Sequence, residues 1–300
     1  MKKPIASLTM LCFFAILMLA LSGCQRPDGS YEENTDTIND YEDLEVLEKE
    51  TLSLDDADIY EMYAQAMIPL TMADSFILYV TTSIHAESQG ADILSMAMNG
   101  RVYQIDSGET GPELKLNLFT VLPEMSMPVL AFYRNGMYYV DMGEIGIKMP
   151  LDFAELAGQS HVGIGEFSVP EYSILNRSGV QLAEGGYRLT FSLAASAVHE
   201  MIEREMKDTF VEANNLTFHG ITLEAALTAN RELASVLMDI DFSMETEGQV
   251  INVLMITGAT IEQVGGVVID FPDRLANFFA VDSQIMTLTT GLYEEQIAQQ

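Results

Sequence analysis

Residues 234–263 of this 300-residue chain read ASVLMDIDFSMETEGQVINVLMITGATIEQ, and this stretch decides the fold class. Apolar and polar residues alternate along much of it, which is the period of a β-strand with one buried face. The dipeptide Glu247-Gly248 interrupts the alternation and predicts a tight turn between strands at 234–246 and 250–263. Both strands are about twice the usual 5 to 6 residues, so we expect a long antiparallel hairpin within a curved sheet.

The same two-residue period predicts further strands along most of the chain. They lie at residues 76–85, 92–106, 113–121, 128–133, 137–142, 147–149, 187–193 and 221–228. Asn99-Gly100, inside the second of these segments, and Asn135-Gly136 are strong signals for two-residue hairpin turns. The side chains that we expect to line the inner face of the sheet are Leu114, Leu116, Leu118, Tyr187, Leu189, Phe191, Met238, Ile240, Phe242 and Met244.

Three segments predict helices. Residues 56–75 begin with acidic side chains, which favour a helix N-terminus, and carry an apolar stripe from Ile59 to Met67. Residues 151–157 and 196–212 predict two more helices. Because long antiparallel strands must cover their apolar face, we expect these helices to lie across it. The predicted fold class is α+β: a long-stranded curved antiparallel β-sheet, or half-barrel, with two or three helices covering its concave face.

The N-terminus has the composition of an export signal. Two lysines precede an apolar run over residues 5–21, which ends in Leu21-Ser22-Gly23-Cys24. This tetrapeptide resembles the lipobox of bacterial lipoproteins, which implies a lipidated Cys24 and a signal peptide over residues 1–23. The resemblance implies a protein held on the extracytoplasmic face of the cell membrane. The alternative is an uncleaved membrane anchor, for which an apolar run of about 17 residues is at the short limit.

The segment after the cysteine is acidic. Residues 24–54 are rich in carboxylates, Asn, Ser and Thr and poor in branched apolar residues, so they bury too little surface to fold alone. We interpret them as a flexible tether between the membrane and a folded domain over residues 55–300. The Asp55-Asp56-Ala57-Asp58 run lacks the ligand spacing of an EF-hand loop, and whether the chain binds calcium stays open.

The order of these elements resembles one family. The chain resembles the LolA/LppX-like lipoproteins, and within them uncharacterised Gram-positive members, in the order of its elements. That order is lipobox, acidic tether, helix, long hairpins, the turn segment 133–140 with its following strand, then a strand, a helix and three final strands. The resemblance covers about residues 56–263. It implies a half-barrel with a hydrophobic cavity that carries lipids or lipoproteins in the members whose role is understood.

Composition and missing motifs exclude several other functions. The chain has 14 basic and 45 acidic residues, a formal net charge of −31, so it repels nucleic acid. Its two cysteines, Cys12 and Cys24, precede the folded part, which therefore has neither a disulfide nor a thiolate metal site. The His199-Glu200 pair lacks the second histidine of a zincin helix, and the other histidines look isolated. We expect no enzyme activity, no cofactor and no metal site.

Methionine usage favours an adaptable apolar interior. Of the 19 methionines, several lie on predicted strands, and flexible thioethers fill irregular apolar space and tolerate varied ligands. The sequence therefore predicts a membrane-anchored, non-catalytic binder or carrier of a lipid or other acyl-bearing ligand. The alternative is a structural or sensory module of the cell envelope that binds a protein partner through the surface of the sheet.

Overall fold

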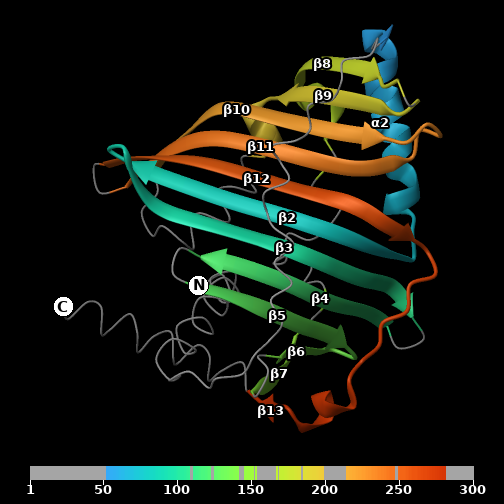
Figure 1. Cartoon of the computed structure of the whole chain (residues 1–300), viewed down its shortest axis with the longest axis vertical. Coiled ribbons are helices and arrows are strands. Elements are labelled where there is room, and N and C mark those ends of the chain that lie inside the picture. The colour runs from blue at the N-terminus through green and yellow to red at the C-terminus, as the bar shows by residue number, and fades with distance from the viewer. Residues whose placement is uncertain are drawn as a thin grey trace, which may run out of the picture.

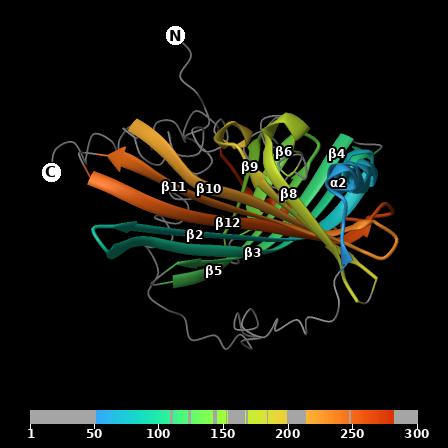
Figure 2. The same ribbon diagram turned by 90° about the horizontal axis from the view of Figure 1, so that it is seen from above.

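One large, strongly curved sheet dominates the computed structural model (Figure 1). The structure describes residues 52–108, 111–122, 125–141, 145–151, 153, 167, 169–183, 185–198, 214–246 and 249–281. The view from above shows the strands sweeping through a trough rather than lying flat (Figure 2). The predicted long-stranded curved antiparallel sheet is confirmed.

The strands have the following bounds. They are β1 (Leu52–Ser53), β2 (Ser75–Ser88), β3 (Ala91–Gly108), β4 (Gly111–Leu122), β5 (Met125–Arg134), β6 (Met137–Asp141), β7 (Gly146–Pro150), β8 (Ile174–Gln181), β9 (Tyr187–Leu193), β10 (Asn214–Leu227), β11 (Leu233–Thr246), β12 (Gln249–Val264) and β13 (Phe279–Ala280). The short strand β8 was not predicted, because its sequence, ILNRSGVQ, carries polar residues on both faces.

The sheet order is β1-β8-β9-β10-β11-β12-β2-β3-β4-β5-β6-β7-β13. Strands β2 to β7 form one antiparallel meander and β8 to β12 a second, and the two meet where β12 pairs with β2. Strand β13 pairs in parallel with β7, whereas the other neighbours are antiparallel. Because β1 and β13 stand at opposite ends of this order, the sheet is not closed into a barrel.

Helix α2 (Asp56–Thr71) covers one end of the concave face. Its predicted apolar stripe is confirmed, since Ile59, Tyr63 and Met67 are all buried. The helix contacts β8 and β11, and the Tyr63 ring lies 5.1 Å from the Phe191 ring of β9. In Figure 1 it stands at one end of the strands, and the β2–β3 turn lies at the opposite end.

The two or three helices expected on the concave face are not confirmed. Within the described ranges α2 is the only α-helix described over more than one residue; Phe153 is also helical, and three short 3-10 helices are η2 (Glu171–Ser173), η3 (Ala195–Ala197) and η4 (Asp273–Asn277). Residues 195–197, at the start of the helix predicted at 196–212, form a 3-10 turn. Most of that predicted helix, and of the one at 151–157, lies outside the described residues.

The predicted turn at Asn99-Gly100 is wrong, because β3 runs straight through it. Gly100 is paired with Leu118 on β4, and its φ of +148° is one that side-chain-bearing residues rarely adopt. A Cβ on Gly100 would lie 2.1 Å from the Asn117 carbonyl oxygen. The glycine therefore allows a close backbone approach inside a strand, and the real turn of this hairpin is Gln89-Gly90, where both φ angles are positive.

The predicted hairpin turn at Asn135-Gly136 agrees with the structure. Asn135 and Gly136 both have positive φ angles and join β5 to β6, as a two-residue primed turn requires. The predicted turn at Glu247-Gly248 lies outside the described residues, and Thr246 pairs with Gln249 on either side of it. The strand register places alternate residues on the concave face.

A segment that the sequence did not reveal follows β12. Residues 265–281 run from beside Ser75 of β2, past the ends of the strands, to β13, where the Val281 amide donates to the Lys148 carbonyl oxygen at 2.8 Å (Figure 1). The Phe271 ring packs 5.8 Å from the Phe132 ring, and Lys148 Nζ donates to the Ala276 carbonyl oxygen at 2.7 Å. We call residues 265–281 the C-terminal strap.

Candidate functional site

The side chains predicted to line the inner face all lie on the concave face of the sheet. Nine of the ten are buried, and Tyr187 is half-buried. They form two groups. Strand β4 contributes the three leucines, whereas β9 and β11 contribute the other seven, and β12, β2 and β3 lie between the groups. All belong to, or pack against, one hydrophobic cluster that spans the sheet.

The register explains how the β9 and β11 residues meet. Leu223 of β10 is paired with Phe191 of β9 on one side and with Met238 of β11 on the other. Leu223, Leu189 and Ile240 have no exposed surface. This part of the concave face is therefore tightly packed around α2.

At the end of the concave face away from α2, fully buried side chains such as Phe242 and Met244 lie beside partly exposed ones. The partly exposed side chains are apolar and still pack against the cluster, and they come from five strands near the β2–β3 turn. They are Ile84, Leu94, Met98, Met127, Leu216, Phe218 and Met255. We call these seven residues the half-buried end. Our sequence candidates missed it, although the Met98 and Met255 thioethers were a usable signal.

Two tyrosines of α2 donate hydrogen bonds to backbone carbonyl oxygens of the segment before η2. The Tyr63 hydroxyl donates to the Phe167 carbonyl oxygen, and the Tyr60 hydroxyl donates to the Val169 carbonyl oxygen at 3.4 Å. Burial raises the pKa of Tyr63 well above its ordinary value, because desolvation disfavours the phenolate. Tyr63 is therefore a neutral structural donor.

The chemistry of the concave face is apolar with a few hydroxyl groups. Its cluster consists of aliphatic, methionine and aromatic side chains. Across its middle, Thr82 and Thr257 share a hydrogen bond of 3.2 Å between their hydroxyl oxygens. Thr120 is also buried there, and its hydroxyl has no hydrogen-bond partner. Such a face can recognise apolar molecules by burial and shape, and the threonines offer hydroxyls to a polar group.

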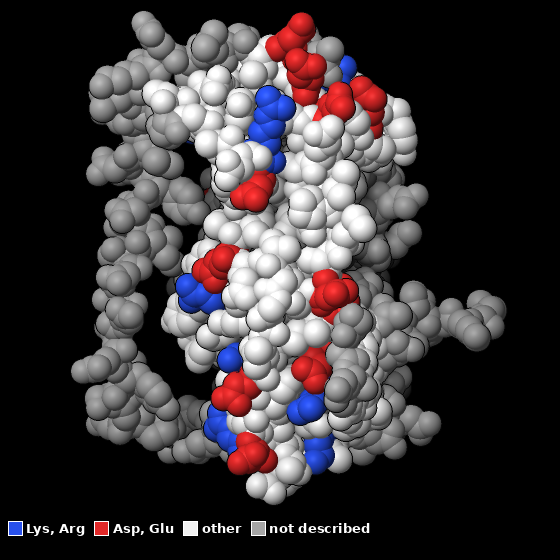
Figure 3. All heavy atoms as spheres, turned by 90° about the vertical axis from the view of Figure 1, so that its right-hand side faces the viewer, with Lys and Arg blue, Asp and Glu red and all other residues white. Residues whose placement is uncertain are grey.

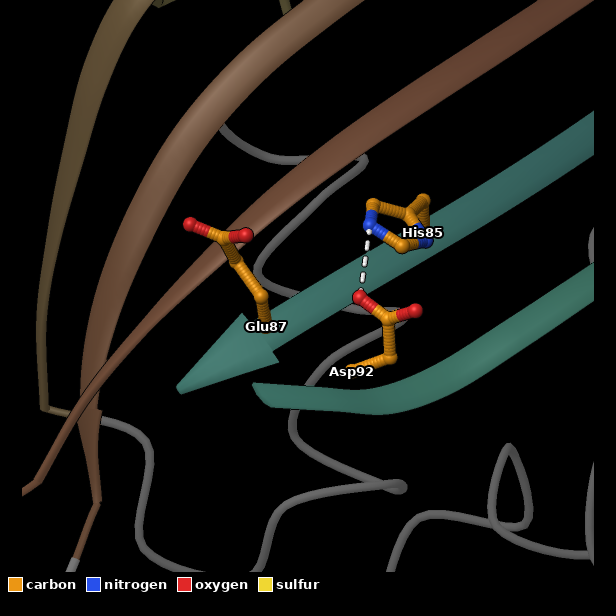
Figure 4. A group of neighbouring side chains, drawn as sticks. All are labelled: His85, Glu87 and Asp92. Atoms are coloured by element: carbon orange, nitrogen blue, oxygen red, sulfur yellow. Dashed lines mark ion pairs between the residues drawn. The ribbon is translucent and has the colours of Figure 1, made fainter. Parts of the chain in front are cut away.

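The convex face holds two histidines that looked isolated in the sequence. Both lie on strands, β2 and β10, but each has polar neighbours that the sequence did not reveal. His85 Nε2 lies 3.4 Å from Asp92 Oδ1, with Glu87 beside them (Figure 4), and His219 Nε2 lies 3.0 Å from Ser243 Oγ. Strand register brings these groups together from positions that are separate in the sequence. His161 and His199 lie outside the described residues.

Charged side chains are mixed on the side of the molecule near α2. Figure 3 shows the Lys and Arg side chains of the described residues there scattered among Asp and Glu, with broad uncharged areas between them. Elsewhere in the described residues, Arg101 Nε lies 2.8 Å from Glu262 Oε2, and the Glu262 carboxylate raises the pKa of Arg101. The side of the described surface near α2 does not present a basic stripe of the kind that nucleic-acid binding requires.

The predicted membrane anchor lies outside the described residues. Cys24, the signal peptide at 1–23 and most of the tether at 24–54 fall in that part of the chain. Among the described residues, no helix has both the length and the apolar character needed to cross a bilayer. Lipidation of Cys24 stays a prediction from the sequence.

Comparison with known proteins finds solved structures with weak similarity to this chain, among them the following two. No protein-family model and no curated protein sequence matches the chain. The crystal structure of LprF from Mycobacterium bovis is 8% identical, with a TM-score of 0.34, and the match covers 71% of this chain and 98% of that one. The dehydratase domain from the CurF module of curacin polyketide synthase is 9% identical, with a TM-score of 0.12, over 71% and 85% of the two chains.

Proposed function

We propose that this chain is a lipoprotein that is anchored by a lipidated Cys24 to the extracytoplasmic face of a membrane and binds an acyl-bearing molecule, without catalysis, on its concave face. The observation that carries the proposal is the continuous apolar concave face of an unclosed sheet, with one end half-buried. The lipobox-like sequence and the order of elements, which resembles that of LolA/LppX-like lipoproteins, support it.

The half-buried end is the part of this face that would receive the ligand. Leu189, near Ile59 of α2, and Ile240, which pairs with Met255, are fully buried, so an acyl chain would have to displace neighbouring side chains to reach them. Met98, Met127 and Met255 retain exposed surface and have flexible thioethers that adapt to varied apolar shapes. We therefore place the first contact of the ligand at the half-buried end, beside Phe242 and Met244, and the other sequence candidates deeper in the site.

The binding free energy at such a site depends more on the length of the acyl chain than on its headgroup. Each buried methylene contributes about 0.8 kcal/mol, without directional requirements. The hydroxyl of Thr120, next to Met98 in the ladder between β3 and β4, is the polar group best placed to accept or donate a hydrogen bond to the ligand. We expect long acyl chains to bind and short ones to be released.

Photo-crosslinking tests the proposal. The full chain, purified in detergent micelles, is irradiated with a palmitic acid that carries a diazirine near its methyl end, and the labelled peptides are identified by mass spectrometry. We expect labels on the concave residues of β3, β5 and β12, and competition by unlabelled palmitic acid. Labelling confined to convex residues such as Leu237 and Leu254, or no labelling that palmitic acid displaces, would contradict ligand binding on the concave face.

A pair of variants locates the site within that face. Met98→Gln places a polar amide at the half-buried end, so we expect it to reduce the displaceable labelling severalfold. Leu237→Gln makes a similar change on the convex face, where Leu237 is 38% exposed, and serves as the matched control. Equal labelling of the two variants would show that the half-buried end is not the entry point.

A further inference from the structure

The turn end of the β2–β3 hairpin gathers three metal-ligating side chains on the convex face. His85 and Glu87 come from β2 and Asp92 from β3 (Figure 4). One ligand atom from each residue lies within 4.8 Å of the other two. The group lies on the opposite face of the sheet from the proposed acyl site, so it is independent of that proposal.

Strand geometry explains why these three residues meet. His85 and Glu87 are two positions apart, so both point to the convex face, while Ala86 between them is buried on the concave face. The ladder between β2 and β3 shifts register here, since Ala86 pairs with Leu94 but Glu87 pairs with Asp92. Ile93 is the extra residue of this bulge. Bulges re-aim side chains, and this one places Asp92 opposite Glu87 and beside His85.

The contacts among these three side chains contribute little to the stability of the fold. The His85 and Asp92 side chains are 45% and 75% exposed, and an exposed ion pair contributes at most about 1 kcal/mol. Two carboxylates held near one another also repel, and the chain as a whole is strongly acidic. A bound cation would relieve that repulsion.

We propose that His85, Glu87 and Asp92 bind one divalent transition-metal ion, with zinc as the reference ion. Imidazole nitrogen with two carboxylates suits zinc and neighbouring first-row metals, whereas calcium prefers 6 to 8 oxygen ligands. Zinc bonds to nitrogen and oxygen are about 2.0–2.2 Å long, so the ligand atoms must move closer together by small side-chain rotations. Their exposure leaves room for that movement and for water at the remaining coordination positions.

A fourth protein ligand is available from the neighbouring strand. Asn252 of β12 is paired with Glu87 across the ladder and is exposed on the same face. Its carboxamide oxygen is a weaker ligand than a carboxylate. We therefore assign the binding energy to the three residues of the hairpin and an auxiliary role to Asn252.

Isothermal titration calorimetry with zinc chloride tests the site. The full chain, freed of metal by a chelator and kept in detergent micelles, is titrated with zinc chloride, and separately with calcium chloride. We expect one saturable zinc site whose affinity falls at least tenfold in His85→Ala and in Asp92→Asn, while circular dichroism shows both variants folded. His219→Ala removes an exposed histidine elsewhere on the convex face and serves as the matched control.

The imidazole proton resonances identify the ligand directly. The resonance that is missing from the spectrum of His85→Ala must be the one that zinc shifts in the wild-type chain. No saturable binding in the wild-type chain, an equal loss of affinity in His219→Ala, or calcium binding as tight as zinc binding would overturn the proposal. A zinc shift confined to another histidine would overturn it as well.

Discussion

Arg274 donates a hydrogen bond to the buried carboxylate of Asp141 and so ties the C-terminal strap to β6. The Asp141 side chain is 2% exposed, whereas that of Arg274 is 54% exposed. A carboxylate this deeply buried needs a charged or hydrogen-bonding partner to offset its desolvation. The strap thus helps to satisfy the edge of the sheet that β6 and β7 form.

Removing this arginine is expected to destabilise the fold. Arg274→Ala leaves the Asp141 carboxylate with less compensation, so we expect the free energy of unfolding to fall by about 1–3 kcal/mol in urea titration. Arg177→Ala is the matched control, because the Arg177 ion pair with Glu171 lies at the surface and contributes at most about 1 kcal/mol. An equal effect of the two substitutions would show that the strap contact is not important for stability.

Gly100 supplies a second stability prediction. A Cβ at this position would collide with the Asn117 carbonyl oxygen, and the positive φ angle disfavours any side chain. We expect Gly100→Ala to lower the free energy of unfolding by at least about 2 kcal/mol. Gly220→Ala is the control, since a Cβ on Gly220 of β10 would meet nothing within 4 Å. A similar stability of both variants would contradict the close approach of β3 and β4.

The long strands could be predicted from the sequence because their period is local. Leu114, Leu116 and Leu118 alternate with polar residues, and a half-buried strand requires that pattern wherever it lies in the sheet. The dipeptides that predict turns at Asn135-Gly136 and Glu247-Gly248 are equally local signals. Asn99-Gly100 misled the prediction, because the same dipeptide also suits a strand that another backbone approaches closely.

The strap and the His85 group could not be predicted, for a different reason. Residues 265–281 have no period, and their place is set by distant contacts such as that of Arg274 with Asp141. Asp92 joins His85 only through the register shift at Ile93, which no short pattern encodes. The half-buried end likewise depends on where α2 lies on the sheet.

Asp239 predicts a pH dependence of stability. Desolvation, and to a lesser extent the charge of Asp241, raise the pKa of Asp239 above its ordinary value of 3.8. The folded state therefore holds this proton more tightly than the unfolded state, and ionisation as the pH rises above 3.8 costs stability. We expect Asp239→Asn to raise the melting temperature at pH 7, with a gain that shrinks as the pH falls toward 3.8.

Thermal melts across this pH range measure the effect. Asp270→Asn is the control, because Asp270 is an exposed carboxylate of the C-terminal strap and lies outside this pair. A melting temperature at pH 7 that is unchanged in Asp239→Asn, or an equal gain in the control, would contradict the raised pKa that we assign to desolvation of Asp239 and to the charge of Asp241.

A substitution of Thr120 is expected to change the stability of the fold and ligand binding on the concave face in opposite directions. Its buried hydroxyl has no partner in a mostly apolar cluster, and such an unsatisfied group costs about 1–3 kcal/mol. Thr120→Val keeps the shape and removes the hydroxyl, so we expect the free energy of unfolding to rise by about 1 kcal/mol or more. If Thr120 forms a hydrogen bond with the polar group of an acyl ligand, the same variant captures less of the diazirine-labelled palmitic acid although it is more stable.

Thr82→Val is the control for stability, because it breaks an existing hydrogen bond with Thr257 and is expected to destabilise the fold. A loss of stability in Thr120→Val would show that its hydroxyl is satisfied in solution, and unchanged capture would remove Thr120 from the proposed binding site.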